Sequence, residues 1–294
     1  MLYTYSLYGL RVQLDFSFPF LEPLNNNTKP DITVSCDNSL QLNHRIELNE
    51  TLSDLNLRTA NIENKYYKCI IKNGSSIKYK FKGRLHNNSL LINFLHMPFA
   101  FAMFQRGYLP IHGMSFLDNK KVIILSGMSE SGKSTLTSYI SKTHKVRSED
   151  ITCVIYKNNK IYSMPSFPIL LSEEVHSKHL KRFSSSKVSR ERTINLLSDK
   201  YDDENLVEVK RIYILEWGDY DEIKILEDGE ALKKLLISSF KPYPFNNCID
   251  SERVYFKNMM GLIRHNEIYL YTRKKNKDIY SHINLIKHIK NDSS

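Results

Sequence analysis

A short glycine- and serine-rich stretch constrains this chain more than any other feature of its sequence. Residues 124–140 read ILSGMSESGKSTLTSYI, and Gly127 to Ser134 match the pattern G-x-x-x-x-G-K-[ST] at every fixed position. The apolar run Lys121–Ser126 predicts a strand before the match, and Lys133–Lys142 is predicted to be a helix after it. That context predicts a loop that binds phosphate groups through its backbone, rather than an ordinary tight turn.

The residue types at the fixed positions explain this prediction. Gly127 and Gly132 can take backbone dihedral angles that other residues avoid, so successive N–H groups can point at a phosphate. Lys133 supplies a mobile charge for the β- and γ-phosphates, and the Ser134 hydroxyl can bind the Mg²⁺ that bridges them. We therefore expect a nucleoside triphosphate, with ATP as the leading candidate, and Mg²⁺ as cofactors, although the loop alone does not distinguish ATP from other phosphoryl donors. The candidate nucleotide-binding residues are Gly127, Ser129, Gly132, Lys133, Ser134 and Thr135.

Composition allows a folded core without help from metals or disulfides. Of the 294 residues, 41% are hydrophobic and 25% are charged, which is typical of globular proteins, and the length favours two domains. We expect a β-rich amino-terminal domain over residues 1–100, with a role in substrate recognition, and a domain that carries the phosphate-binding loop over residues 101–294.

Local patterns predict elements on both sides of that boundary. In the first domain, Leu2–Leu14 is expected to be one opening strand and Lys65–Gly83 a hairpin that turns at Asn73-Gly74. The second domain is expected to alternate strands and helices, as α/β folds do. Its further predicted elements are a helix after Pro98 that ends at Gly107, strands Lys145–Tyr156 and Ile161–Met164, helix Ser172–Phe183, paired strands Arg211–Glu216 and Glu222–Leu226, helix Asp228–Phe240, and a closing helix within Arg273–Ser294.

The remaining features limit partners and location. The net charge of +10 suits an anionic partner, but no motif for nucleic-acid recognition accompanies it, so no nucleic acid is expected. No run approaches the roughly 18 apolar residues that a membrane span needs, and the first residues lack the pattern of a signal peptide. We therefore expect a cytoplasmic protein without a membrane partner. The sequence leaves the assembly state open, including a homo-oligomer.

Two further residue pairs stand near the loop in sequence. His112-Gly113 precedes the strand of the loop, and Glu149-Asp150 follows the helix after it. These pairs, together with G-x-S-x-x-G-K-S-T from Gly127, resemble the carboxyl-terminal domain of HPr kinase/phosphorylase and its kinase relatives. That family shares its nucleotide-binding core with ATP-dependent phosphoenolpyruvate carboxykinase.

The resemblance covers roughly residues 109–271 and implies a fold and a reaction. The fold would be α/β, with a P-loop core of the HPr-kinase and carboxykinase type and a β-rich amino-terminal domain added to it. The reaction would be transfer of the γ-phosphate of ATP to a hydroxyl, most often that of a serine, in a peptide or a small molecule. Relatives of this kind include serine kinases of ribosomally made peptides, lasso peptides among them.

The resemblance also implies roles for individual residues. His112 would lie near the γ-phosphate, with Lys133 at the phosphates. One carboxylate of Glu149-Asp150 would accept the proton of the attacking hydroxyl, and the other would help Ser134 to hold Mg²⁺, with Asp150 as the candidate ligand. The family generally has two aspartates here, so the longer Glu149 leaves open which carboxylate is the base.

Three functional hypotheses remain at this point. The leading one is the kinase described above, although the glycine-rich segment that engages HPr is not recognisable, so HPr itself is not an expected substrate. A nucleotide-hydrolysing switch or ATPase would also need the phosphate-binding loop. A binding module that nucleotide merely stabilises would need the loop but no catalytic carboxylate.

Overall fold

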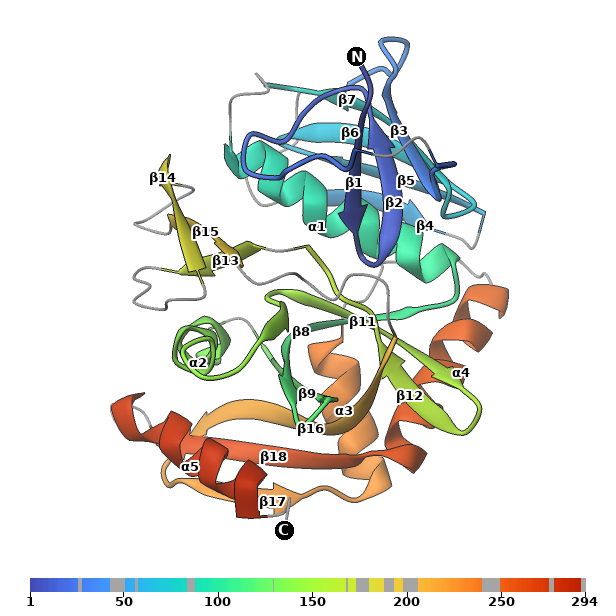
Figure 1. Cartoon of the computed structure of the whole chain (residues 1–294). Helices are drawn as coiled ribbons and strands as arrows, with labels where there is room; N and C mark the ends of the chain where they lie inside the picture. Colours follow the sequence, from blue (N-terminus) through green and yellow to red (C-terminus); the bar gives the residue numbers. More distant parts are fainter. Residues whose placement is uncertain are drawn as a thin grey trace.

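The computed structural model describes residues 1–25, 28–42, 51–55, 58–83, 88–128, 130–167, 169–172, 180–187, 193–197, 206–239, 249–274 and 278–291. Within these ranges the chain is a mixed α/β protein with two large sheets and one small sheet (Figure 1). Helix α1, Asn88–Gln105, lies between the two large sheets and contacts strands of both (Figure 1).

The amino-terminal sheet has seven strands in the order β1-β2-β3-β7-β6-β5-β4. They are β1 Tyr3–Leu7, β2 Leu10–Leu14, β3 Ile32–Cys36, β4 Thr51–Leu55, β5 Thr59–Asn64, β6 Tyr67–Lys72 and β7 Ser76–Phe81. The hairpin predicted at Asn73-Gly74 is confirmed, and both turn residues have positive φ, 54° and 60°. The single strand expected over Leu2–Leu14 is wrong, because Tyr8 and Gly9 also have positive φ and divide it into the hairpin β1–β2.

Helix α1 begins well before Pro98, the residue after which the sequence predicted its start. A proline inside a helix removes one backbone hydrogen bond and costs about 3 kcal/mol. Each fully buried large apolar side chain contributes about 1.5–3 kcal/mol in return. The apolar residues that α1 buries before the proline are Leu90, Leu91, Ile92, Phe94 and Leu95. Burial between two sheets therefore outweighs the local penalty of the proline.

The second large sheet has eight strands. They are β8 Leu109–Asp118, β9 Lys121–Gly127, β10 Val146–Ser148, β11 Ile151–Lys157, β12 Lys160–Ser163, β16 Val207–Gly218, β17 Glu222–Ile225 and β18 Glu267–Lys274. Strands β9, β16 and β18 are parallel neighbours, so their carboxyl ends share one edge of the sheet. The strand expected over Lys145–Tyr156 is interrupted, because the chain bends at Glu149-Asp150 between β10 and β11.

The remaining described elements are helices and a separate small sheet. They are α2 Lys133–Ile140, α3 Asp228–Ser238, α4 Ile249–His265, α5 Asp278–Asn291, and a three-stranded sheet of β13 Ile169–Ser172, β14 Leu180–Lys187 and β15 Thr193–Leu197. Three predicted helices are confirmed: α2 follows the predicted phosphate-binding loop, α3 matches the helix predicted at Asp228–Phe240, and α5 is the helix predicted in the tail.

Two expectations for the second half are wrong. Residues 180–183 of the helix expected over Ser172–Phe183 belong to strand β14, while residues 173–179 lie outside the described part of the chain. Strands β16 and β17 do not pair with each other, because β18 lies parallel to β16 and separates the two. Pairing with a strand distant in sequence has replaced the local hairpin that the sequence suggested.

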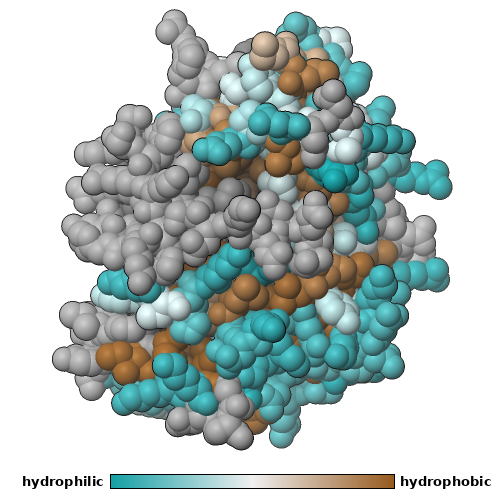
Figure 2. Space-filling view, viewed as in Figure 1, coloured by the Kyte–Doolittle hydropathy of each residue, from teal (hydrophilic) through white to brown (hydrophobic). Residues whose placement is uncertain are grey.

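The apolar core is continuous from the amino-terminal sheet through α1 to the second sheet. The division at residue 100 falls within α1, and we keep the two-domain organisation as a proposal. On the face in Figure 2, hydrophilic residues cover much of the carboxyl-terminal part, and apolar residues show between the two parts. Among the described residues, none of the helices is both long and apolar enough to cross a membrane.

Candidate functional site

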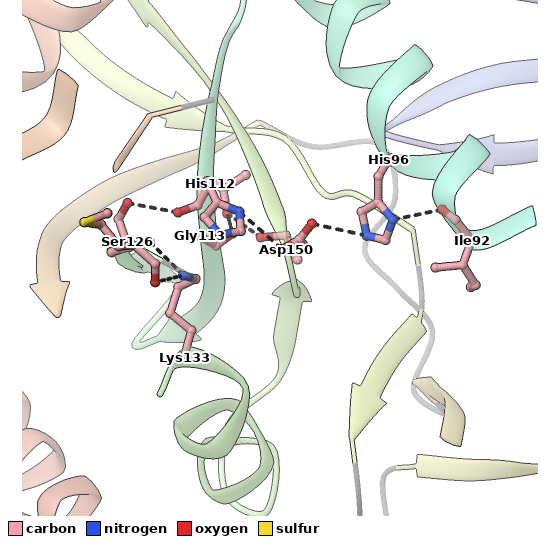
Figure 3. Close-up of polar contacts among 11 residues, drawn as sticks. Ile92, His96, His112, Gly113, Ser126, Lys133 and Asp150 are labelled. Atoms are coloured by element: carbon pink, nitrogen blue, oxygen red, sulfur yellow. Dashed lines mark hydrogen bonds and ion pairs between the residues drawn. The ribbon is translucent and has the colours of Figure 1, made fainter. Parts of the chain in front are cut away.

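Strand β8 brings the predicted site residues together. Its His112 pairs with Ile151, the first residue of β11. Its Gly113 pairs with Ser126, near the end of β9. The backbone N–H of Gly113 donates to the carbonyl of Asp150 at 2.9 Å. The predicted phosphate-binding loop after β9 and the acidic pair before β11 therefore flank one strand (Figure 3).

The loop predicted to bind phosphate joins β9 to α2. Gly132 has φ 80°, and a Cβ added at Gly127 would lie 2.7 Å from the carbonyl oxygen of Leu215, so both positions require glycine. The Lys133 ammonium donates to the carbonyls of Gly127 at 2.7 Å and Met128 at 2.9 Å. Lys133 is only 8% exposed. These contacts hold a largely buried cation against the loop, where it can attract an anion.

The carboxylate of Asp150 lies between two histidines (Figure 3). Its Oδ1 is 3.2 Å from Nδ1 of His112, and its Oδ2 is 3.8 Å from Nε2 of His96. The Asp150 side chain is 39% exposed, so solvent or a substrate can reach it. A carboxylate in this position can receive a proton from a hydroxyl group.

His96 comes from α1, and nothing in its sequence context singles it out. It is one polar side chain in an apolar helical run, which usually indicates a core position. In the structure its Nδ1 donates to the carbonyl of Ile92 at 2.8 Å, and its ring packs edge-on against Phe167 with centroids 4.9 Å apart. These contacts direct Nε2 towards Asp150, so the amino-terminal half supplies one wall of the site.

The surroundings lower the pKa of both the acid and the lysine. Burial raises the pKa of Asp150, but the hydrogen bond from His112 and the charges of His96 and Lys133 outweigh it, so the pKa lies well below the usual aspartate value. Burial lowers the pKa of Lys133 from its ordinary 10.5, while the carboxylates of Asp150 and Glu149 oppose that shift. Asp150 is therefore ionised at neutral pH.

Two residues at the shared edge of the parallel strands also contact the loop, and the motif did not predict them. Trp217 lies near the end of β16 and donates from Nε1 to the carbonyl of Glu130 at 2.8 Å. Arg273 lies near the end of β18 and donates from Nη2 to the carbonyl of Ser131. In the sequence, Trp217 falls between the two strands predicted to pair, and Arg273 is the first residue of the segment predicted to contain the closing helix.

The structure places the remaining predicted residues as follows. Glu149 is buried, at 8% exposure, beside Asp150. Ser134 is partly exposed and Thr135 exposed, both in the first turn of α2. Ser129 lies outside the described residues. The structure thus gathers Gly127, Gly132, Lys133, His112 and Asp150 at one place, with Glu149 adjacent.

Comparison with known proteins adds little beyond this geometry. No protein-family model matches the sequence, and no curated protein does. The solved structure of the Hpr(Ser) kinase/phosphatase from Coxiella burnetii is similar over 63% of this chain and 99% of that chain, at 10% identity and a TM-score of 0.34. A likeness this low leaves function to be argued from the site itself.

Proposed function

We propose that the chain is an ATP- and Mg²⁺-dependent phosphotransferase that transfers the γ-phosphoryl group to a hydroxyl, with serine in a peptide or small molecule as the expected acceptor. The observation that carries the proposal is the ionised carboxylate of Asp150, reachable from solvent, beside the buried lysine of a phosphate-binding loop. A nucleotide switch needs only the loop, whereas a transferase also needs a proton acceptor there.

The residues of the loop fit a nucleoside triphosphate. Lys133 supplies the charge, and the loop leads into the amino-terminal end of α2, whose first N–H groups favour anions. Among the described residues, the buried hydroxyl of Ser131 has no hydrogen-bond partner, and a phosphate oxygen could satisfy this polar group. When bound, Mg²⁺ would neutralise phosphate charge, held by the Ser134 hydroxyl and a carboxylate of the acidic pair.

The surroundings of the two carboxylates favour different roles. Each carboxylate oxygen of Asp150 faces a histidine nitrogen, at 3.2 Å for His112 and 3.8 Å for His96, and these nitrogens occupy positions that a metal ion would need. We therefore assign Asp150 as the proton acceptor and Glu149 as the carboxylate for Mg²⁺, which reverses the expectation that Asp150 holds the metal. In the transfer, the acceptor hydroxyl gives its proton to Asp150. The hydroxyl oxygen forms a bond to the γ-phosphorus, and the bond between that phosphorus and the leaving oxygen of ADP breaks.

A low pKa at Asp150 is compatible with this role. Phosphoryl transfer passes through a loose transition state in which the attacking hydroxyl makes little bond to phosphorus, so a strong base is not required. An ionised carboxylate orients the hydroxyl and takes its proton late. Lys133 stabilises the negative charge that develops on the leaving ADP.

The direct test is incubation with ATP, Mg²⁺ and candidate acceptors, with mass spectrometry to detect a gain of one phosphoryl group. The acceptors should include free serine and peptides with an internal or terminal serine, each matched to an alanine peptide. Steady release of phosphate without transfer to any hydroxyl would instead favour a nucleotide-hydrolysing protein. Nucleotide binding without either reaction would favour a module that nucleotide stabilises.

A further inference from the structure

Trp217 and Arg273 are paired in register on the parallel strands β16 and β18, at the edge where the phosphate-binding loop begins. The guanidinium carbon of Arg273 lies 4.2 Å from the centre of the Trp217 ring, which is a cation–π contact. Arg273 is only 2% exposed. Because burial of a permanent charge is costly, its position under the loop calls for a specific explanation.

Both side chains bind the backbone of the loop. The carbonyl of Glu130 accepts from Trp217, and the carbonyl of Ser131 accepts from Arg273. At the next residue, Gly132, an added Cβ would lie 2.6 Å from Nη2 of Arg273 and 3.2 Å from the Trp217 ring. The pair therefore contacts three consecutive loop residues, which immediately precede the lysine.

These contacts determine which way the loop amides point. In a planar trans peptide the C=O and the following N–H point in opposite directions. Because Arg273 holds the carbonyl of Ser131, the N–H of Gly132 must face away from Arg273. Because Trp217 holds the carbonyl of Glu130, the N–H of Ser131 is directed to the carbonyl of Met128, which it reaches at 3.1 Å.

We propose that Trp217 and Arg273 form a loop clamp: a pair of positioning residues that fixes the peptide planes of Glu130 and Ser131. The first plane closes the turn of the loop itself, through the bond from Ser131 to Met128, and the second orients the N–H of Gly132 for a phosphate before the ligand arrives. The buried guanidinium also adds positive potential beneath the phosphates. The clamp depends on one part of the proposed function, which is that the loop binds phosphate. It does not depend on which hydroxyl accepts the phosphoryl group. Preorganised amides bind an anion without the cost of reorienting the backbone.

The experiment compares variants of the full chain for binding of ADP and of inorganic tripolyphosphate by calorimetry. Trp217→Phe keeps an aromatic ring but removes the indole N–H donor. Arg273→Met removes both the positive charge and the N–H donors. Arg273→Lys restores the charge and one donor. The matched control is Arg211→Met. Arg211 is also a buried arginine, but it lies on β16, binds Glu267 at 2.7 Å and makes none of the clamp's contacts with the loop.

We expect Trp217→Phe and Arg273→Met each to weaken tripolyphosphate binding about tenfold, as the loss of one oriented hydrogen bond implies. Arg273→Lys should recover part of that loss, and Arg211→Met should bind like the wild type even if it melts at a lower temperature. Wild-type affinity in both clamp variants would overturn the proposal. Tripolyphosphate isolates the loop because it lacks the nucleoside.

Amide hydrogen exchange without ligand gives a second readout that does not depend on nucleotide binding. The clamp predicts faster exchange of the loop amides, Ser131 in particular, in Trp217→Phe and Arg273→Met but not in Arg211→Met. Unchanged exchange in the clamp variants would refute it even if the wild type bound no phosphate. Failure of the wild type to bind, combined with faster exchange in the variants, would reject the proposed function and leave the clamp supported.

Discussion

Nδ1 of His112 lies 3.2 Å from Oδ1 of Asp150, although one residue belongs to the middle of β8 and the other to the bend before β11. The antiparallel pairing of β8 with β11 creates this contact, since Ile151 pairs directly with His112. The contact orients one carboxylate oxygen and keeps it ionised. It also distinguishes Asp150 from its neighbour Glu149, a distinction that the sequence left open.

Asp150→Asn should abolish most phosphoryl transfer while nucleotide still binds. The amide is nearly isosteric but cannot accept a proton, so turnover should fall about 10²- to 10⁴-fold. Steady-state kinetics and calorimetry with ADP measure the two effects separately. Glu149→Gln is the matched comparison, for which we expect a higher Mg²⁺ requirement. The assignment of the base would be wrong if Glu149→Gln were the variant with normal Mg²⁺ dependence and lost turnover.

The acidic limb of the pH–rate profile should move to higher pH when either histidine is removed. The hydrogen bond from His112 and the charge of His96 both lower the pKa of Asp150. Without them the carboxyl becomes protonated at a higher pH, and activity falls sooner as the solution is acidified. In kcat/KM measured from pH 4 to pH 8, the wild type should show no acidic limb, because its Asp150 titrates below this range, whereas His112→Gln and His96→Gln should lose activity towards pH 4. Profiles as flat as that of the wild type in both variants would contradict the role of the two histidines in keeping Asp150 ionised.

Lys133→Met should weaken the binding of ADP about ten- to one-hundredfold, because a hydrogen bond from a charged group contributes about 1.5–3 kcal/mol. Lys121→Met is a suitable control, since Lys121 is exposed at the start of the same β9–loop segment and pairs with Glu208 at 3.1 Å. Trp217 is the single tryptophan of the chain and contacts the loop, so its fluorescence can follow the titration. Equal affinities in the two variants would mean that nucleotide binds elsewhere.

Gly113→Ala should destabilise the protein by about 1–3 kcal/mol, the usual cost of forcing a group into a packed interior. An added Cβ would lie 2.6 Å from the carbonyl oxygen of Leu125, on the paired strand β9. Gly229→Ala in α3 is the opposite control, because nothing lies within 4 Å of its Cβ position. There we expect up to about 1 kcal/mol of stabilisation from the higher helix propensity of alanine. Urea unfolding of both variants measures the difference.

Two wrong predictions from the sequence share one physical cause. Helix α1 passes through Pro98, and β18 separates β16 from β17. In each case an energy gained from partners far away in the chain exceeds a local preference. Local patterns could not reveal those partners, because burial and strand pairing depend on the whole fold.

The sequence by itself predicted a phosphate-binding loop and placed it correctly between a strand and a helix, β9 and α2, since the glycine positions and the lysine are local requirements of backbone geometry and charge. It also identified His112 and Glu149-Asp150 as candidates from their order along the chain. Only the tertiary structure brought His96, Trp217 and Arg273 to the site and separated the surroundings of the two carboxylates. The physical reason is that strand register, helix burial and electrostatic environment arise from contacts between segments that are remote in sequence.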